Sequence, residues 1–415
     1  MKNLKLLLIA LFFGGALVYT SSCKKSDTAA STTPTLATIT TLGIVNVTPT
    51  TADAGGDVPS DGNQGLSAVG VCYSSTNPIP SLTTDLFTNN GVSTGNFTSP
   101  LTGLLENTTY YVRAYATNPS GTVYGSVVTF QTLAGWVGQH SGTTNNLNGV
   151  FFIDANNGYA VGNSGTIIKT TNTGITWTTE TSGITNNLNG VYFANAAIGY
   201  AVGSSGTILK TTTGGSTWVN QTSSITTNLN SVCFTDTSNG YAVGNGGVIL
   251  KTTTGGSIWT NQSSGITTNL TSVYFTGSTT GYAVGSDGVI LNTTNAGVTW
   301  SAQSSGTSNN LNSVYFTNST NGYAVGVGGV ILNTTNAGTT WIVKTSGYGN
   351  ELQSVYFADA NNGFIVGYGA TTLSTNNGGV NWVNQPNGTS NILFGAYVTT
   401  QHAYAVGSFG TVLHY

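Results

Sequence analysis

The last two thirds of the chain repeat one pattern of apolar and polar positions every 41 residues. All seven tryptophans fall on this period, together with seven of the leucines, and the runs between them alternate apolar with polar side chains. Such alternation is typical of β-strands that bury one face. The tryptophans are Trp136, Trp177, Trp218, Trp259, Trp300, Trp341 and Trp382, and the leucines are Leu147, Leu188, Leu229, Leu270, Leu311, Leu352 and Leu393. Residues 134–415 are therefore predicted to be a run of all-β units.

Each repeat is predicted to contain four short strands. In one repeat we expect them over 311–316, 322–326, 329–334 and 340–343, with glycines at the joins that suit tight turns. A single four-stranded sheet cannot bury both of its faces, whereas sheets stacked radially can. Because 41 residues is also the length of a propeller blade, we predict a seven-bladed β-propeller.

The two ends of the repeat region are out of phase with each other. It opens with 136–140, which matches a fourth strand, and it stops at 410–415, which matches a third strand. We therefore predict that the opening segment supplies the fourth strand of the last blade. Such a strand closes the ring and hides edges that an open array would expose.

A separate module is predicted over 35–133, where short alternating strands are divided by Gly, Pro and Asn clusters. The stretch 104–121 resembles the tyrosine-corner strand of fibronectin type III domains, with Glu106 where Pro is usual. This resemblance implies a β-sandwich in which the Tyr110 hydroxyl ties back to upstream backbone. The predicted fold class is all-β, a seven-bladed β-propeller preceded by a fibronectin type III-like β-sandwich.

The first residues have the features of an export signal. Lys2 and Lys5 precede an apolar run over 6–18, which is too short to span a bilayer. Small residues follow, and then Cys23, an arrangement that resembles the lipobox at which bacterial lipoproteins are cleaved and acylated. The alternative is an ordinary signal peptide that is cleaved near Ser22.

The lipobox resemblance implies a membrane anchor. We predict a lipoprotein signal peptide over 1–23 with acylated Cys23, a linker over 24–34, and a lipid-anchored protein at the outer membrane or cell surface that meets the membrane through this anchor only. The remaining cysteines, Cys72 and Cys233, lie in apolar contexts in different predicted domains. We expect them to be buried and unpaired.

Charged residues make up only 5% of the chain, with a net charge of −3 and Arg113 as the only arginine. The positive surface that nucleic-acid binding requires is missing, which excludes nucleic acid as a partner. Three lysines share one repeat position, and we expect a solvated strand edge there rather than an anion site; they are Lys169, Lys210 and Lys251. The histidines have no metal-ligand spacing, so no metal and no cofactor is predicted; they are His140, His402 and His414.

The turn between the third and fourth strands carries the string Thr-x-Asn/Thr-x-Gly-x-Thr-Trp, for example at 170–177 and 293–300. It resembles the Asp-box turn of sialidases, with Asn or Thr in place of Asp. Taken with the strings at 311–316 and 322–326, the region 135–415 resembles the propeller family named after the photosystem II assembly and stability factor. The resemblance implies the fold, and nothing else in the sequence indicates a photosystem.

Enzymatic readings find little support. A resemblance to sialidases would imply a cluster of three arginines that binds the carboxylate of the substrate. The only arginine of this chain, Arg113, lies outside the repeats. A glycoside hydrolase that uses two carboxylates remains the alternative function, since Asp287 and Glu351 are acids that break the repeat. We predict a binding or scaffold protein that is not an enzyme.

Departures from a regular repeat are free to serve a ligand, because the retained residues serve packing. On the face built by the loops between blades and by the turns after the second strands, most repeats carry only small polar residues. The departures predicted to bind a protein partner or a glycan are Tyr348, Glu351, Tyr368, Phe409 and Asp287. The alternative is drift near the ring closure, and the protein is expected to be a monomer.

Overall fold

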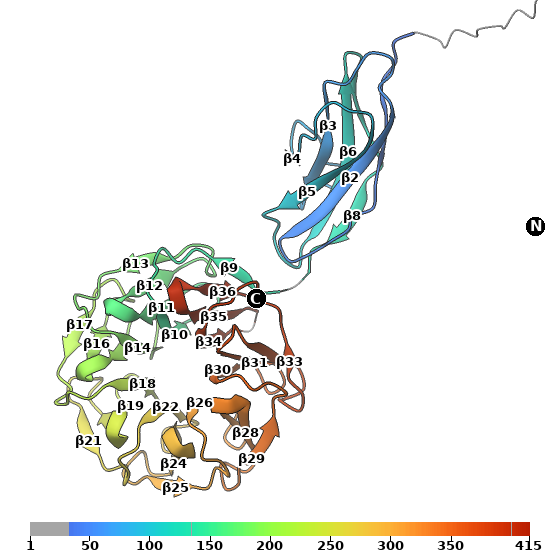
Figure 1. Ribbon diagram of the computed structural model, residues 1–415. Coiled ribbons are helices and arrows are strands. Elements are labelled where there is room, and N and C mark those ends of the chain that lie inside the picture. The colour runs from blue at the N-terminus through green and yellow to red at the C-terminus, as the bar shows by residue number, and fades with distance from the viewer. Residues whose placement is uncertain (1–32, 134, 400) are drawn as a thin grey trace, which may run out of the picture. The chain divides into compact units, whose positions relative to one another are not determined.

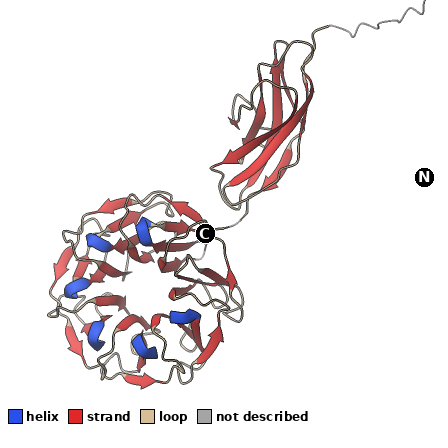
Figure 2. Ribbon diagram, viewed as in Figure 1, coloured by secondary structure: helices blue, strands red, loops and turns tan. Residues whose placement is uncertain are grey.

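The computed structural model describes residues 33–133, 135–399 and 401–415, and nearly all of its regular structure is β-strand (Figure 1, Figure 2). The helices in these residues are single 3₁₀ turns of three residues. None of the helices that the model describes is long and apolar enough to cross a membrane. The predicted signal peptide, the acylation of Cys23 and most of the linker lie outside the described residues.

The described residues divide into two compact units. The first consists of the residues up to Gly43, with Ala54–Ser99 and Tyr111–Val128, and the second consists of Ile44–Asp53, Pro100–Tyr110 and Thr129–Tyr415. The residues ahead of the repeats form two antiparallel sheets, with strand orders β1-β2-β5 and β4-β3-β6-β7, and β8 also pairs with β6. The strands are β1 Thr38–Thr41, β2 Thr51–Ser60, β3 Ala68–Ser74, β4 Leu86–Phe87, β5 Gly95–Thr102, β6 Thr109–Asn118, β7 Gly121–Tyr124 and β8 Val128–Gln131.

Small apolar side chains fill the space between these two sheets. Val58 of β2 lies in one buried cluster with Val69 of β3 and Ala116 of β6. The hydroxyl oxygen of Tyr110 accepts a hydrogen bond from the backbone N–H of Leu105 at 2.9 Å, so this side chain does tie back to upstream backbone.

Both described cysteines are buried and unpaired, as expected from their apolar contexts. Burial raises the pKa of the Cys72 thiol to about 11 and that of Cys233 to about 12. Neither thiol is therefore in the reactive, ionised form near neutral pH.

Seven four-stranded antiparallel sheets follow in the described residues, and Figure 1 shows them around a common centre. We call them blades 1 to 7. Blade 1 is β10 Leu147–Phe152, β11 Gly158–Gly162, β12 Ile167–Thr170 and β13 Thr178–Glu180; blade 2 is β14 Leu188–Phe193, β15 Gly199–Gly203, β16 Ile208–Thr211 and β17 Val219–Gln221; blade 3 is β18 Leu229–Phe234, β19 Gly240–Gly244, β20 Ile249–Thr252 and β21 Thr260–Gln262. Blade 4 is β22 Leu270–Phe275, β23 Gly281–Gly285, β24 Ile290–Thr293 and β25 Ser301–Gln303; blade 5 is β26 Leu311–Phe316, β27 Gly322–Gly326, β28 Val330–Thr334 and β29 Ile342–Thr345; blade 6 is β30 Leu352–Phe357, β31 Gly363–Gly367, β32 Thr372–Thr375 and β33 Val383–Asn384.

The seventh blade draws its strands from both ends of the repeat region. It consists of β34 Leu393–Val398, β35 Ala403–Gly407, β36 Val412–His414 and β9 Val137–Gln139, in that order. The antiparallel pairing of β36 with β9 sets Val412 opposite Gln139 and His414 opposite Val137.

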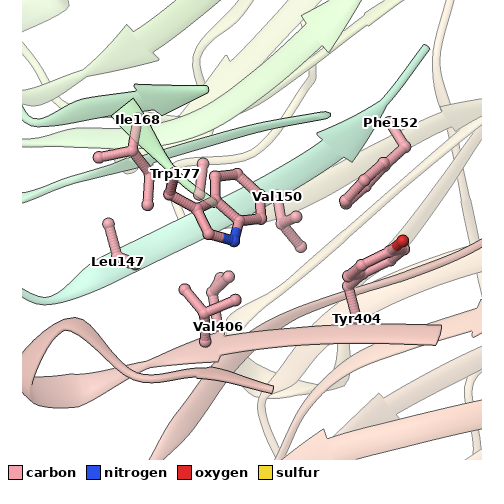
Figure 3. Packing of buried hydrophobic residues seen from close by; sticks show 9 residues of the cluster. Leu147, Val150, Phe152, Ile168, Trp177, Tyr404 and Val406 are labelled. Carbon is pink, nitrogen blue, oxygen red and sulfur yellow. The ribbon is translucent and has the colours of Figure 1, made fainter. Parts of the chain in front are cut away.

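The core of this region lies between neighbouring blades. Figure 3 shows Phe152 and Trp177 of blade 1 facing Tyr404 of blade 7. The rings of Phe152 and Tyr404 stack with centroids 3.8 Å apart, and the indole of Trp177 meets Phe152 edge-on at 6.0 Å. Because offset and edge-on pairs suit the aromatic quadrupole, the repeated Phe, Tyr and Trp hold each blade to the next.

Close steric contacts explain the glycines of the Gly-Tyr-Ala-Val-Gly string. A Cβ on Gly158 would lie 2.5 Å from the ring of Phe152, and one on Gly162 would lie 1.9 Å from the carbonyl oxygen of Asn146. A Cβ at Gly162 would therefore require the backbone to move, and one at Gly158 would require the Phe152 ring to move. Blade 7 has Ala403 at the Gly158 position, where Val398 replaces the phenylalanine. These contacts explain why the string recurs with the period of the blades.

Candidate functional site

The inner strands of all seven blades line a cavity of about 310 Å³ at the mouth of a central channel. The second residue of each inner strand contributes to it, and six of these seven side chains are polar. They are Asn148, Asn189, Asn230, Thr271, Asn312, Gln353 and Phe394. The mouth is thus an amide-rich ring with one aromatic side chain.

These amides also bind the blades to one another. The Nδ2 of Asn148 donates to the carbonyl of Leu188 in the next blade at 2.8 Å, and Asn189, Asn230 and Asn312 repeat this bond. Among the described residues, no protein donor reaches the Oδ1 of Asn148 or Asn312. The mouth therefore presents carbonyl oxygens as acceptors.

An aromatic layer lies three residues further along each inner strand. Tyr315 and Tyr356 have ring centroids 4.5 Å apart, and Tyr356 and Tyr397 have centroids 4.4 Å apart. Burial raises the pKa of Tyr356 far above its ordinary value, so this layer is uncharged. Its members are Phe151, Tyr192, Cys233, Tyr274, Tyr315, Tyr356 and Tyr397, and Cys233 is the one that is not aromatic.

Glu351 places a carboxylate beside two of the side chains that line this cavity. Five blades have an asparagine at its position, and that asparagine accepts a backbone N–H from the preceding blade, as Asn187 does from Ser164 at 2.9 Å. The Glu351 carboxylate instead accepts from Asn312 Nδ2 at 3.0 Å and from Gln353 Nε2 at 2.7 Å. Among the described residues it has no ion-pair partner.

The other predicted site residues lie in blades 4, 6 and 7 and in the loop between blades 5 and 6. Tyr368 follows β31, and its backbone N–H donates to the Glu351 carbonyl at 2.9 Å, so these two positions are adjacent. Tyr348 lies in the loop that leads to Glu351, and its side chain is 38% exposed. Phe409 is held by Asn146 of blade 1, and Asp287 by Asn310 of blade 5. No contact joins Phe409 or Asp287 to Glu351 in the part of the chain described, so the structure joins only Glu351 and Tyr368, whereas Tyr348 is a neighbour of Glu351 in the sequence.

Three of the four remaining acids of this region cap turns, and the fourth, Glu180, ends strand β13. Asp236 accepts from the backbone N–H groups of Ser238 and Asn239 and from the Asn239 side chain. The bond from the Asn239 side chain, with those two backbone bonds, holds the pKa of Asp236 below its ordinary value. A carboxyl group that acts as a general acid near neutral pH needs a raised pKa. The lowered pKa of Asp236 therefore fits a role in stabilising the turn. Asp154 and Asp359 repeat the arrangement.

The expectation of a solvated lysine edge is wrong. The Nζ of Lys169 donates to the carbonyl of Gly214 in the next blade at 2.8 Å, and Lys210 and Lys251 repeat this bond at 2.6 and 2.7 Å. Each ammonium also lies 5.5 to 5.8 Å from the ring of a tyrosine in its own blade. These lysines are half-buried ties between blades, because the next blade's turn covers the strand from which they project.

A ring of like sheets around a polar channel mouth defines a β-propeller. The family model for the photosynthesis system II assembly factor YCF48 matches residues 129–220, 182–264, 214–306, 254–347 and 293–391. The chain belongs to this family. No curated protein matches it.

Solved structures show the same fold. The structure named YCF48 bound to D1 peptide is 19% identical, covers 68% of this chain and 95% of its own, and has a TM-score of 0.59. YCF48 from Cyanidioschyzon merolae is 20% identical, with coverages of 68% and 99% and a TM-score of 0.59. The WD40 β-propeller domain of Doa1 is 12% identical, with coverages of 68% and 97% and a TM-score of 0.56. At these identities the likeness concerns the fold.

Proposed function

We propose that this protein is a cell-envelope scaffold whose propeller binds a protein partner at the channel mouth. One family member has been solved with a peptide bound, which makes peptide recognition a natural use of the fold. In this chain the Glu351 carboxylate carries the proposal. It is a half-buried carboxylate that accepts hydrogen bonds from two side-chain amides, and it has no ion-pair partner among the described residues. A Lys or Arg side chain of a partner would supply a cation for it.

The propeller in this proposal is a closed seven-bladed ring over 134–415 that follows a fibronectin type III-like module over 35–133. An acylated Cys23 and the linker over 24–34 tie it to the outer membrane or cell surface. Replacing Cys23 by Ala is expected to move the protein from the membrane fraction to the soluble fraction, whereas Cys72→Ala, at a buried thiol, leaves it anchored. Equal membrane association of both variants would refute the anchor.

Selection of a random dodecapeptide library on residues 33–415 tests the binding function. Peptides that contain Lys or Arg are expected to be enriched and to lose about tenfold or more in affinity for Glu351→Gln. The matched control is Asp287→Asn, which removes one negative charge from an exposed turn of blade 4. Enrichment of peptides without a cation, or equal binding to Glu351→Gln, would contradict this assignment.

Glycan binding at the channel mouth and hydrolysis are the competing functions of this site. A hydrolase would need Asp287 and Glu351 to act on one bond, yet Asp287 lies in the turn after β23 of blade 4 and Glu351 directly before β30 of blade 6, with blade 5 between them. We therefore propose that the protein is not an enzyme. Release of reducing ends from a polysaccharide by the wild type, and its loss in both Asp287→Asn and Glu351→Gln, would overturn this.

A further inference from the structure

One blade interface differs from all the others. At six interfaces, the turn between the third and fourth strands of one blade covers a second-strand tyrosine of the preceding blade. Tyr159, for example, donates its hydroxyl to the carbonyl of Gly214 at 2.6 Å, and Gly215 lies against its ring, where a Cβ would come within 2.5 Å. The other pairs are Tyr200 with Gly255, Tyr241 with Ala296, Tyr282 with Ala337, Tyr323 with Gly378, and Tyr404 with Thr173.

Blade 7 has no such turn that could cover the second strand of blade 6. Its third and fourth strands, β36 and β9, come from opposite ends of the repeat region, so no chain connects them directly. The blade 6 residue at the tyrosine position is Phe364. The hydroxyl is thus missing at the one interface where the carbonyl that would accept it is missing too.

The uncovered interface is a cavity of about 510 Å³ between blades 6 and 7. The six covered tyrosines are at most 4% exposed, whereas Phe364 is only partly buried. The rings of Phe364 and Tyr415 lie 5.2 Å apart and both line the cavity, together with Asn362, Asn381 and Gln385. A cavity of this size lies within the range of small-ligand sites, about 300 to 1,000 Å³. We call it the blade 6/7 slot.

The slot has no positively charged side chain. No Lys or Arg lines it, and its single side-chain carboxylate, Asp359, is exposed to solvent and already accepts three hydrogen bonds from Asn361 and Asn362. Burial lowers the pKa of His402, the histidine in the lining, which is therefore uncharged near pH 7. An anionic ligand would be desolvated there without a counter-charge.

The slot is also unsuited to a peptide turn. At the first three interfaces, a tyrosine hydroxyl and a lysine ammonium donate to the carbonyl of the covering turn, as Tyr159 and Lys169 do. Blade 6 has Phe364 and Ser374 in these places, and the Ser374 hydroxyl already accepts from Gln385. What remains is an aromatic floor beneath a rim of side-chain amides, which can both donate and accept.

We propose that the blade 6/7 slot binds a neutral saccharide, whose C–H face lies on Phe364 and Tyr415 and whose hydroxyls bond to Asn381 and Gln385. This site is separate from the channel mouth and does not depend on the function proposed for it. Both fit one protein, because the slot opens between two blades whereas the channel is lined by all seven.

Titration calorimetry of residues 33–415 with cellohexaose, maltohexaose, xylohexaose and chitohexaose tests the proposal. At least one of these neutral probes is expected to bind, and Phe364→Ala is expected to weaken that binding about tenfold or more. The control is Tyr323→Phe, which produces the phenylalanine of blade 6 at a covered interface and is expected to leave binding unchanged.

A second variant keeps the test valid if Phe364→Ala unfolds. Asn381 is exposed at the slot rim, and Asn381→Ala is expected to lower the affinity severalfold, whereas Thr340→Ala at the same position of blade 5 leaves it unchanged. The proposal fails if none of the four probes binds at millimolar concentration, if a trigalacturonate anion binds better than all of them, or if both slot variants bind like the wild type. Peptide selection on Phe364→Ala distinguishes the two sites, since the channel-mouth ligand is expected to remain bound.

Discussion

The hydroxyl of Tyr404 donates to the backbone carbonyl of Thr173, 231 positions earlier in the chain, at 3.1 Å. It joins blade 7 to blade 1 in the way that other tyrosines join consecutive blades. The contact therefore belongs to the closed ring and has no counterpart in an open array.

Removal of this hydroxyl is expected to weaken the ring closure. Tyr404→Phe loses one hydrogen bond while its ring still stacks on Phe152, so the free energy of unfolding should fall by about 1 kcal/mol. Urea denaturation measures the change. Phe364→Tyr serves as the control, because it adds a hydroxyl where the blade interface has no covering turn, and a gain of similar size there would contradict our description of the blade 6/7 slot.

Substitution of a string glycine is expected to be severe. Gly162→Ala would place a methyl group 1.9 Å from the Asn146 carbonyl oxygen, and the loss in unfolding free energy should be about 3 kcal/mol or more because backbone must move. Gly138→Ala is the matched control, since a Cβ there meets nothing within 4 Å. Comparable melting temperatures for the two variants would show that blade 1 accommodates a methyl group at position 162 without loss of stability.

Phe409 has a backbone φ of 55°, in the left-handed region that disfavours bulky side chains. Phe409→Gly is expected to raise the unfolding free energy by about 0.5 to 1 kcal/mol, because the ring is 73% exposed and little packing is lost. The reciprocal change is Gly246→Phe, at the same turn position in blade 3, where a Cβ meets nothing within 4 Å. It should lower stability by a similar amount, and calorimetric melting of both variants checks the pair.

The turn-capping acids make stability depend on pH. The folded-state pKa of Asp236 lies below the unfolded value, so the stabilisation that it provides is complete above the unfolded pKa, about 4, and is lost as the pH falls through the folded pKa. Asn318 caps the same turn in blade 5 with an amide oxygen, which indicates that Asp236→Asn will fold.

Asp236→Asn is therefore expected to lose less stability than the wild type between pH 7 and pH 3. Urea midpoints at the two pH values give the comparison. The carboxylate of Asp287 accepts no hydrogen bond in the described structure. Asp287→Asn should therefore lose as much stability between the two pH values as the wild type. A variant at Asp236 that loses as much stability as the wild type would show that this cap contributes nothing.

The strands of a blade were predictable because period-two burial and steric glycines act within one repeat. The second strand expected over 322–326 coincides with β27, and the first, over 311–316, with β26. The fourth strand, expected over 340–343, begins only at Ile342, because Trp341 ends the preceding turn and turns its ring into the blade interface. A local pattern does not distinguish a buried turn residue from a strand residue.

The site was less predictable because its side chains contact residues that lie about 40 positions away in the sequence. The sequence marks Glu351 as a departure from the repeat, yet the orientation of its carboxylate depends on Asn312 in the preceding blade. The lysines were misjudged for the same reason, since Lys169 is covered by Gly214, 45 positions later. The signal that reveals the blade 6/7 slot was present in the sequence, as one phenylalanine among six tyrosines at a position that has a partner only when the next blade has a turn.

The pairing of β36 with β9 has a mechanical consequence. A pull on the chain ahead of Trp136 reaches the ring through the buried Trp136 side chain and one three-residue strand. It loads the pair of Val137 with His414 before the pair of Gln139 with Val412. Because the load meets these pairs one after another, the strand peels from its end instead of resisting as a whole. The ring is then weakest under tension at the seam that closes it, and it would open there while the other six blades remain folded.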